Sequence, residues 1–158
     1  MGAVERVRQR LSAEAPGIEI VHLDKDTRTA ELAARALGTQ VGAIVKSLVF
    51  VADDEVVLAL VAGDKRADAA RLATALGTHL ARIARAAEVK ERTGFAIGGV
   101  PPLVEDAAGH QVRTLMDESL FRYGTVYAAA GSPFDIFPVA PESLRQLTGA
   151  EVVGLAEE

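Results

Sequence analysis

Two apolar segments joined by a very short polar connection constrain the fold of this chain more than any other feature. Residues 44–51 read IVKSLVFV and residues 55–62 read EVVLALVA, and only Ala52, Asp53 and Asp54 separate them. Two aliphatic, β-branched runs around so short a connection predict an antiparallel hairpin. Because no helix separates these strands, a strictly alternating doubly wound sheet is disfavoured.

The rest of the chain mixes helix and strand signals. Alanine and leucine recur at helical spacing in 30–37 and 69–76, a further helix is predicted where Val4, Val7 and Leu11 share a face, and shorter helices are predicted at 86–94 and 141–149. The residues placed to cap or end the two alanine-rich helices are Thr29, Gly38, Asp68 and Gly77. Further strands are predicted at 18–22, 79–84, 112–116, 125–130, 134–139 and 152–156. This order predicts the α+β class, with a mixed, largely antiparallel, barrel-like sheet and flanking helices.

Composition limits the classes of protein to consider. The 158 residues, 49% of them hydrophobic and 25% charged, predict a single domain over residues 1–158. The absence of cysteine excludes disulfides and thiolate zinc sites and favours a reducing compartment, so we expect a cytoplasmic protein. No apolar run reaches the roughly 18 residues that span a bilayer, so we expect no membrane association. The net charge of -5 disfavours a protein that coats nucleic acid, but it permits a small contact.

Lys46 is the first candidate functional residue. Its neighbours on both sides of the predicted strand are apolar, and an isolated buried ammonium is costly. One interpretation places Lys46 near the strand's beginning, with its head reaching the rim of the sheet. The other places the cation at the mouth of a pocket, where it binds a phosphate or carbonyl group.

Two loops rich in small residues are the next candidates. In GFAIGGVPPL (94–103), Gly98 and Gly99 leave backbone amides free to face a ligand such as an oxyanion, although an ordinary tight connection also fits. In AAAGSPFDIF (128–137), a strand runs into Gly131, Ser132 and Pro133. Asp135 could accept a proton or an amine there, or it could be a solvated turn acid.

Other polar residues give weaker signals. His22, His79 and His110 lack the short spacing and the carboxylate neighbours of a metal site, so we predict no metal and no cofactor. Lys65 and Arg66 precede a helix, in a loop that could contact phosphate but more simply leads into the helix cap. Nucleophile-elbow, Walker and dinucleotide-binding motifs are absent from the sequence.

Seven segments, in this order and spacing, resemble the YbaK/ProX family of aminoacyl-tRNA deacylases, which are relatives of the editing domain of bacterial prolyl-tRNA synthetases. The resemblance runs from about residue 24 to the C-terminus and is closest to the stand-alone ProX-like branch. The segments are TRTAELAARALG, VGAIVKSLVF, VAGDKR, ERTGFAIGGVPP, DESL, AAAGSP and LTGAEVVGLAE.

The resemblance implies a barrel-like mixed sheet and hydrolysis of the ester that joins a wrong amino acid to the 3′ end of tRNA. It implies that Lys46 engages the terminal adenosine phosphate and that Gly98–Pro102 is the family's G-x-x-x-P loop beside the scissile carbonyl. One departure is Ser47, where several relatives carry asparagine. Some relatives also carry a histidine in the region of Gly131–Pro133. Both departures leave the amino acid preference open.

The resulting hypothesis is a trans-editing hydrolase that acts on tRNA(Pro) carrying alanine or cysteine. Its partners would be the aminoacylated acceptor end of tRNA and a synthetase. The predicted catalytic residues are Lys46, Gly98 and Gly99. The predicted substrate-binding residues are Thr27, Arg28, Thr29, Ser47, Val100, Pro101, Pro102, Gly131, Ser132, Pro133 and Asp135. The alternatives are a non-catalytic module that binds the same tRNA end or a protein, and a Schiff-base enzyme, which lacks a cofactor-phosphate cradle.

The sequence offers no persuasive general base. Ester hydrolysis needs an attacking water, a stabilised oxyanion and a proton for the leaving ribose oxygen. We therefore expect a ribose hydroxyl or a bound water chain of the substrate to handle the proton, while the protein orients the ester.

Overall fold

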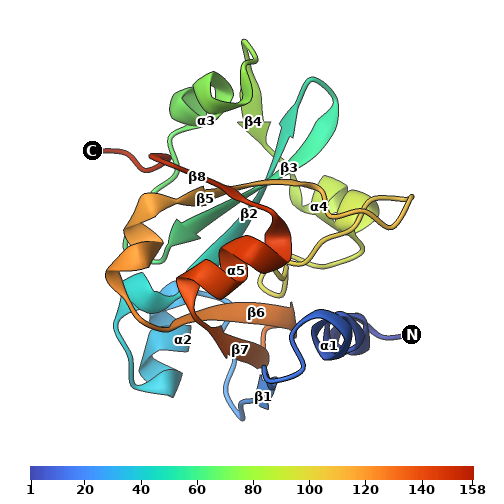
Figure 1. Ribbon diagram of the computed structural model, residues 1–158, viewed down its shortest axis with the longest axis vertical. Helices are drawn as coiled ribbons and strands as arrows, with labels where there is room; N and C mark the ends of the chain where they lie inside the picture. Colours follow the sequence, from blue (N-terminus) through green and yellow to red (C-terminus); the bar gives the residue numbers. More distant parts are fainter.

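The computed structural model describes residues 1–158 as eight strands, five α-helices and two 3₁₀ helices (Figure 1). The helices are α1 (Ala3–Glu14), α2 (Ala30–Leu37), α3 (Ala69–Leu76), α4 (Ala86–Thr93) and α5 (Pro141–Thr148), with 3₁₀ helices η1 (Val41–Ala43) and η2 (Glu118–Arg122). The strands are β1 (Val21–His22), β2 (Val45–Ala52), β3 (Glu55–Ala62), β4 (Ala81–Ile83), β5 (Arg113–Asp117), β6 (Val126–Ser132), β7 (Asp135–Val139) and β8 (Glu151–Val153). None of the helices combines the length and the apolar character that crossing a bilayer requires.

The strands form two sheets. The larger has the order β4-β2-β3-β5-β8 and the smaller the order β1-β7-β6. Pairing is antiparallel except where β5 joins β3 and β8 in parallel. A single bridge between Ile44 and Tyr127 connects the sheets, and Figure 1 shows β6 and β7 beside the larger sheet with α1 at one end. The α+β class, the mixed sheet and the flanking helices are confirmed, but the sheets do not close into a complete barrel.

The predicted hairpin is the centre of the fold. Strands β2 and β3 pair without interruption from Val45 opposite Ala62 to Ala52 opposite Glu55. Asp53 and Asp54 form the turn with φ of 50° and 68°. Two consecutive positive φ values are typical of the tight turn whose twist matches that of the paired strands. The turn therefore fixes the register of every residue on β2, including the candidate Lys46.

The hairpin strands bury both of their faces. On β3, Leu58 and Leu60 belong to the largest apolar cluster, while Ala59 and Val61 pack in a second cluster with Leu72 of α3. A strand covered on both sides reads as a continuous apolar run, because neither face alternates with polar residues. This covering explains why the sequence around Lys46 is apolar on both sides.

Helix caps occur where the sequence predicts them. The Thr29 hydroxyl accepts a hydrogen bond from the Leu32 amide at 3.2 Å, and the Asp68 carboxylate accepts one from the Ala70 amide at 2.9 Å. The helices α2 and α3 end at Gly38 and Gly77, both in the left-handed conformation. The Thr29 cap fixes the start of α2, whose first turn lines a cavity next to β2.

Candidate active site

A cavity of about 450 Å³ lies along the open edge of β2, a volume typical of small-ligand sites. Fourteen of its 22 lining residues are hydrophobic. Its walls are residues 45–49 of β2, the segment 27–31 that leads into α2, the loop 97–100, and residues 83–84 at the end of β4. The cavity therefore brings together segments that lie far apart in the sequence.

Lys46 lines this cavity, half-buried, and its ammonium donates a hydrogen bond to the backbone carbonyl of Lys65. Burial lowers the pKa of Lys46. The Glu31 and Asp64 carboxylates oppose this shift, whereas the Arg66 cation adds to it. Because an ammonium has three donors and the carbonyl uses one, donors remain for a ligand. Lys46 and the glycine loop border the same cavity, as the interpretation of Lys46 as a pocket cation requires.

The loop that holds Lys46 is itself held by the C-terminal segment. The Asp68 amide donates to the Leu155 carbonyl at 2.8 Å, and the Glu157 amide donates to the Arg66 carbonyl at 2.8 Å. Both bonds lie just after Lys65 in the chain, so residues 155–157 hold the loop whose carbonyl orients the Lys46 ammonium.

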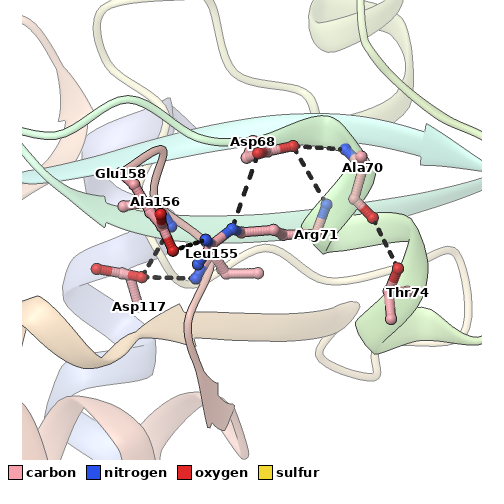
Figure 2. A network of polar contacts seen from close by, with 8 residues as sticks. All are labelled: Asp68, Ala70, Arg71, Thr74, Asp117, Leu155, Ala156 and Glu158. Carbon is pink, nitrogen blue, oxygen red and sulfur yellow. Dashed lines mark hydrogen bonds and ion pairs between the residues drawn. The ribbon is translucent and has the colours of Figure 1, made fainter.

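Asp117, at the end of β5, anchors this C-terminal segment (Figure 2). Its carboxylate is 2% exposed and accepts hydrogen bonds from the amides of Leu155 at 2.7 Å and Ala156 at 3.1 Å. It also accepts bonds from the amide and hydroxyl of Ser119. Both oxygens are therefore used within the protein, and Asp117 is a structural residue that supports the site from a distance.

The two predicted loop glycines differ in their surroundings. Gly98 lines the cavity with φ of 96°, and its amide has no backbone partner. A Cβ there would lie 3.0 Å from the Cβ of Arg28 on the facing segment. The amide of Gly99, in contrast, donates to the Ala96 carbonyl at 3.0 Å, and Gly99 packs against the backbone of Ser132. The expected pair of free amides is therefore reduced to Gly98.

The predicted site residues divide into two sets. Those that line the cavity are Thr27, Arg28, Thr29, Lys46, Ser47, Gly98 and Val100. Those that do not line it are Gly99, Pro101, Pro102, Gly131, Ser132, Pro133 and Asp135.

The second small-residue loop lies behind the cavity wall and braces it. Asp135 is buried and accepts a hydrogen bond from the Ser132 hydroxyl at 2.6 Å. Its other oxygen lies 2.9 Å from Nδ1 of His22. The Thr27 amide donates to the Pro133 carbonyl at 2.7 Å. The interpretation of Asp135 as a solvated turn acid is wrong, and so is the expectation that His22 has no carboxylate neighbour.

Several lining residues were missed from the sequence. Glu31 places a carboxylate in the first turn of α2, close enough to act on the Lys46 pKa. Its position two residues after the Thr29 cap could have indicated it. Ile83 and Ile97 remain 60% and 61% exposed at the cavity and could not have been found, because their proximity depends on packing between distant segments. No group of three potential metal ligands lies together in the structure.

Comparison with known proteins gives a consistent set of similarities. Residues 24–147 match the family described as the aminoacyl-tRNA editing domain. A crystal structure described as a proposed trans-editing enzyme for prolyl tRNA synthetase is 40% identical, with a TM-score of 0.91 over 100% of this chain and 99% of that one. YwhH of Bacillus subtilis strain 168, whose name assigns no function, is 32% identical over 85% of this chain and 83% of its own. EbsC of Enterococcus faecalis, named as a proposed Cys-tRNA(Pro)/Cys-tRNA(Cys) deacylase, is 28% identical over 80% of this chain and 76% of its own.

Proposed function

The chain belongs to the aminoacyl-tRNA editing domain family, and we propose that, as an aminoacyl-tRNA deacylase, it removes alanine or cysteine from wrongly charged tRNA(Pro). The substrate would be the aminoacylated 3′ adenosine. The name of EbsC, which includes Cys-tRNA(Pro), supports the cysteine alternative. The description of the 40% identical structure names prolyl tRNA synthetase, and this supports that synthetase as the partner that supplies the wrongly charged tRNA.

The observation that carries this proposal is that Lys46 and Gly98 line one largely apolar cavity. A fixed cation and a free amide that border the same cavity can hold a phosphate and polarise an ester carbonyl, because electrostatic interactions are stronger where water is excluded. The cation needs no rearrangement on binding, since the Lys65 carbonyl already orients it. This arrangement suits an aminoacyl ester, because such an ester is intrinsically reactive and its hydrolysis can be accelerated mainly by holding it in the right orientation.

The reaction is a simple hydrolysis. Water adds to the ester carbonyl carbon, the amide of Gly98 donates to the oxyanion, and the bond to the ribose oxygen breaks as that oxygen takes up the proton that the water loses. The products are the free amino acid and a tRNA with its 3′-terminal ribose restored. Lys46 would hold the terminal phosphate, while the substrate's own ribose hydroxyl or a bound water would relay the proton.

The cavity selects substrates by size in this proposal. Each methylene contributes only about 1 to 3 kcal/mol to discrimination in an apolar pocket. A site that admits alanine or cysteine and excludes the larger correct amino acid therefore protects correctly charged tRNA better than one that relies on attraction. Val45, Val49 and Val100 form part of the apolar lining that would set this limit.

The test is a deacylation assay with a panel of correctly and wrongly charged tRNAs. We expect the wild-type protein to hydrolyse Ala-tRNA(Pro) or Cys-tRNA(Pro) and to spare Pro-tRNA(Pro). Lys46→Ala should lose about 10²-fold or more in kcat/KM. Lys90→Ala is the matched control, because Lys90 is exposed and outside the cavity. If no charged tRNA is hydrolysed faster than in buffer but one still binds, the protein is a binding module and not an enzyme.

A further inference from the structure

The edge of β2 that faces the cavity is partly unpaired. Strand β4 pairs with β2 only at Phe50–Ala52, and the smaller sheet reaches the other end of this edge through the bridge at Ile44. Between these contacts lies Ser47, which lines the cavity. A stretch of sheet edge is thus left open at the centre of the candidate site.

The hydrogen bonds on either side show which backbone groups face this opening. The Val49 carbonyl accepts from the Ala84 amide at 2.8 Å, on the β4 side of the strand. The Ile44 carbonyl accepts from the Gly63 amide at 2.8 Å, on the β3 side. Because successive residues of a strand direct their backbone groups to opposite edges, Ser47 shares the edge of Val49. The amide and the carbonyl of Ser47 therefore both face the cavity.

The side chain of Ser47 gives a second, independent indication of a missing partner. Its hydroxyl oxygen is buried and has no hydrogen-bond partner within the protein. Buried polar groups in proteins are almost always paired, and an unpaired one costs free energy until a ligand or water satisfies it. Two backbone groups of Ser47 thus face the cavity, and its unpaired hydroxyl is buried next to them.

We propose that the aminoacyl group of the substrate binds as a one-residue antiparallel partner of Ser47, with its α-ammonium donating to the Ser47 carbonyl and its ester carbonyl accepting from the Ser47 amide. In a hydrogen-bonded antiparallel pair, two opposed residues exchange both of these bonds. An aminoacyl ester carries one such donor and one such acceptor on a single residue. This inference rests on the proposed deacylase function.

The pairing separates affinity from selectivity. Every amino acid presents the same ammonium and carbonyl, so the two backbone bonds are common to all substrates. Opposed residues of an antiparallel pair direct their side chains to the same face, so the substrate side chain would lie beside the Ser47 hydroxyl. On that face of β2, Val45 and Val49 pack in one cluster with Val89 and Val100, which would limit the size of the side chain.

The first test observes the Ser47 amide directly by NMR. The probe is 3′-deoxy-3′-(L-alanylamino)adenosine, in which a stable amide replaces the ester. At saturation we expect a downfield shift of the Ser47 amide proton and at least a tenfold slowing of its hydrogen exchange. The amides of β8, the strand at the other edge of the same sheet, should not change. An analogue in which the α-amino group is acetylated should bind at least tenfold more weakly.

The second test removes the donor without changing the side chain. Replacing Ser47 by its α-hydroxy acid analogue turns the amide into an ester and should lower kcat/KM for deacylation about 10²-fold, because this donor would face the developing oxyanion. The melting temperature should fall only slightly, because the Ser47 amide has no protein partner and the only bond affected is the one that the weakened Lys46 carbonyl accepts from β3. The same replacement at Phe50, whose amide faces β3, should lower the melting temperature and leave kcat/KM near the wild-type value.

The outcomes separate this inference from the proposed function. An unchanged Ser47 amide at saturating probe, with shifts at other cavity residues, would overturn the pairing. So would full activity of the Ser47 backbone variant, and in that case the deacylase function would stand. Absence of any deacylation by the wild-type protein would instead overturn the function. A probe-induced shift at Ser47 would then still support the pairing as a mode of binding.

Discussion

Lys46 and Ser47 are adjacent on β2, yet the polar group of one side chain has a hydrogen-bond partner in the protein and that of the other has none. The Lys46 ammonium is held by the Lys65 carbonyl, and the loop that carries this carbonyl is fastened by the C-terminal segment and Asp117. The Ser47 hydroxyl has no partner, and the strand edge at Ser47 is unpaired. The contacts of Lys46 are thus complete in the free protein, whereas those of Ser47 would be completed by the substrate in the pairing that we propose.

This difference indicates which polar groups of the cavity stabilise the fold and which are left to bind a ligand. Partnered groups stabilise the fold and hold their positions, so a ligand that meets them loses little to reorganisation. Unpartnered groups lower the stability of the free protein, and the ligand recovers that free energy on binding. Variants that remove the anchoring contacts of Asp117 should therefore lower stability, whereas a variant that removes the unpaired Ser47 hydroxyl should not.

Removing the Asp117 carboxylate, which anchors the C-terminal segment, should have the largest effect on stability. Asp117→Ala leaves the buried Leu155 amide without a partner and should lower the free energy of unfolding by about 3 kcal/mol. Glu118→Ala is the matched control, because its side chain is exposed, and it should stay within about 0.5 kcal/mol of wild type. Urea unfolding measures both. Equal losses in the two variants would show that the C-terminal segment is held by other contacts.

Gly98→Ala tests whether the glycine loop must approach the facing segment. The residue has φ of 96°, and the new Cβ would lie 3.0 Å from the Arg28 Cβ, so we expect a loss of about 2 kcal/mol in stability and roughly tenfold in deacylation rate. Gly109→Ala is the control, since Gly109 also has a positive φ but has open space around its Cβ position. It should lose about 1 kcal/mol and no activity. If both variants keep full activity, contact between Gly98 and Arg28 does not shape the site.

Ser47→Ala removes a hydroxyl that has no partner, and it should not lower the free energy of unfolding as Asp117→Ala does. Removing a buried hydroxyl that has no partner should leave the free energy of unfolding unchanged or raise it by up to about 1 kcal/mol. Ser119→Ala is the matched comparison, because that hydroxyl donates to Asp117, and it should lower stability by about 1 kcal/mol. A loss of similar size in both variants would mean that the Ser47 hydroxyl is satisfied in solution, for example by ordered water.

The sequence predicted those parts of the fold that depend on local patterns. The hairpin at 44–62, the caps at Thr29 and Asp68, and the helix ends at Gly38 and Gly77 follow from residue spacing and turn chemistry, and the structure confirms them. The predicted strand at 18–22 shortens to Val21–His22, since pairing with β7 is limited to these two residues.

The candidate site was predictable only where its residues lie on such local patterns. Lys46 stood out because an apolar strand surrounded it, and Gly98 because glycines and prolines crowd its loop. The burial of Asp135 beside His22 was not predictable, because it depends on pairing between strands 113 residues apart. The open edge at Ser47 was also hidden, because it is defined by where β4 and β6 stop pairing and not by any residue of β2.

The smallest expected effect is on the pH dependence of stability, and it comes from Lys46. Burial lowers the pKa of Lys46, and the group that holds its ammonium is a neutral carbonyl, not a carboxylate. At pH values below the lowered pKa, the folded protein bears the full cost of the buried charge. As the pH rises from that value toward the unfolded lysine pKa of about 10.4, the unfolded chain binds more protons than the folded one, so stability attributable to Lys46 rises.

Lys46→Met should therefore be at least as stable as wild type at pH 7, with an advantage of no more than about 1 kcal/mol because the side chain remains partly exposed to water. The advantage should shrink as the pH rises from the lowered pKa of Lys46 toward about 10.4, where the wild-type chain sheds the charge on folding. Urea unfolding at several pH values measures this, with Lys90→Met as an exposed control whose difference from wild type should stay constant. An advantage that grows with pH would mean that Glu31 and Asp64 outweigh burial, and Lys46 would then belong to an ion-paired network that holds its charge through the alkaline range.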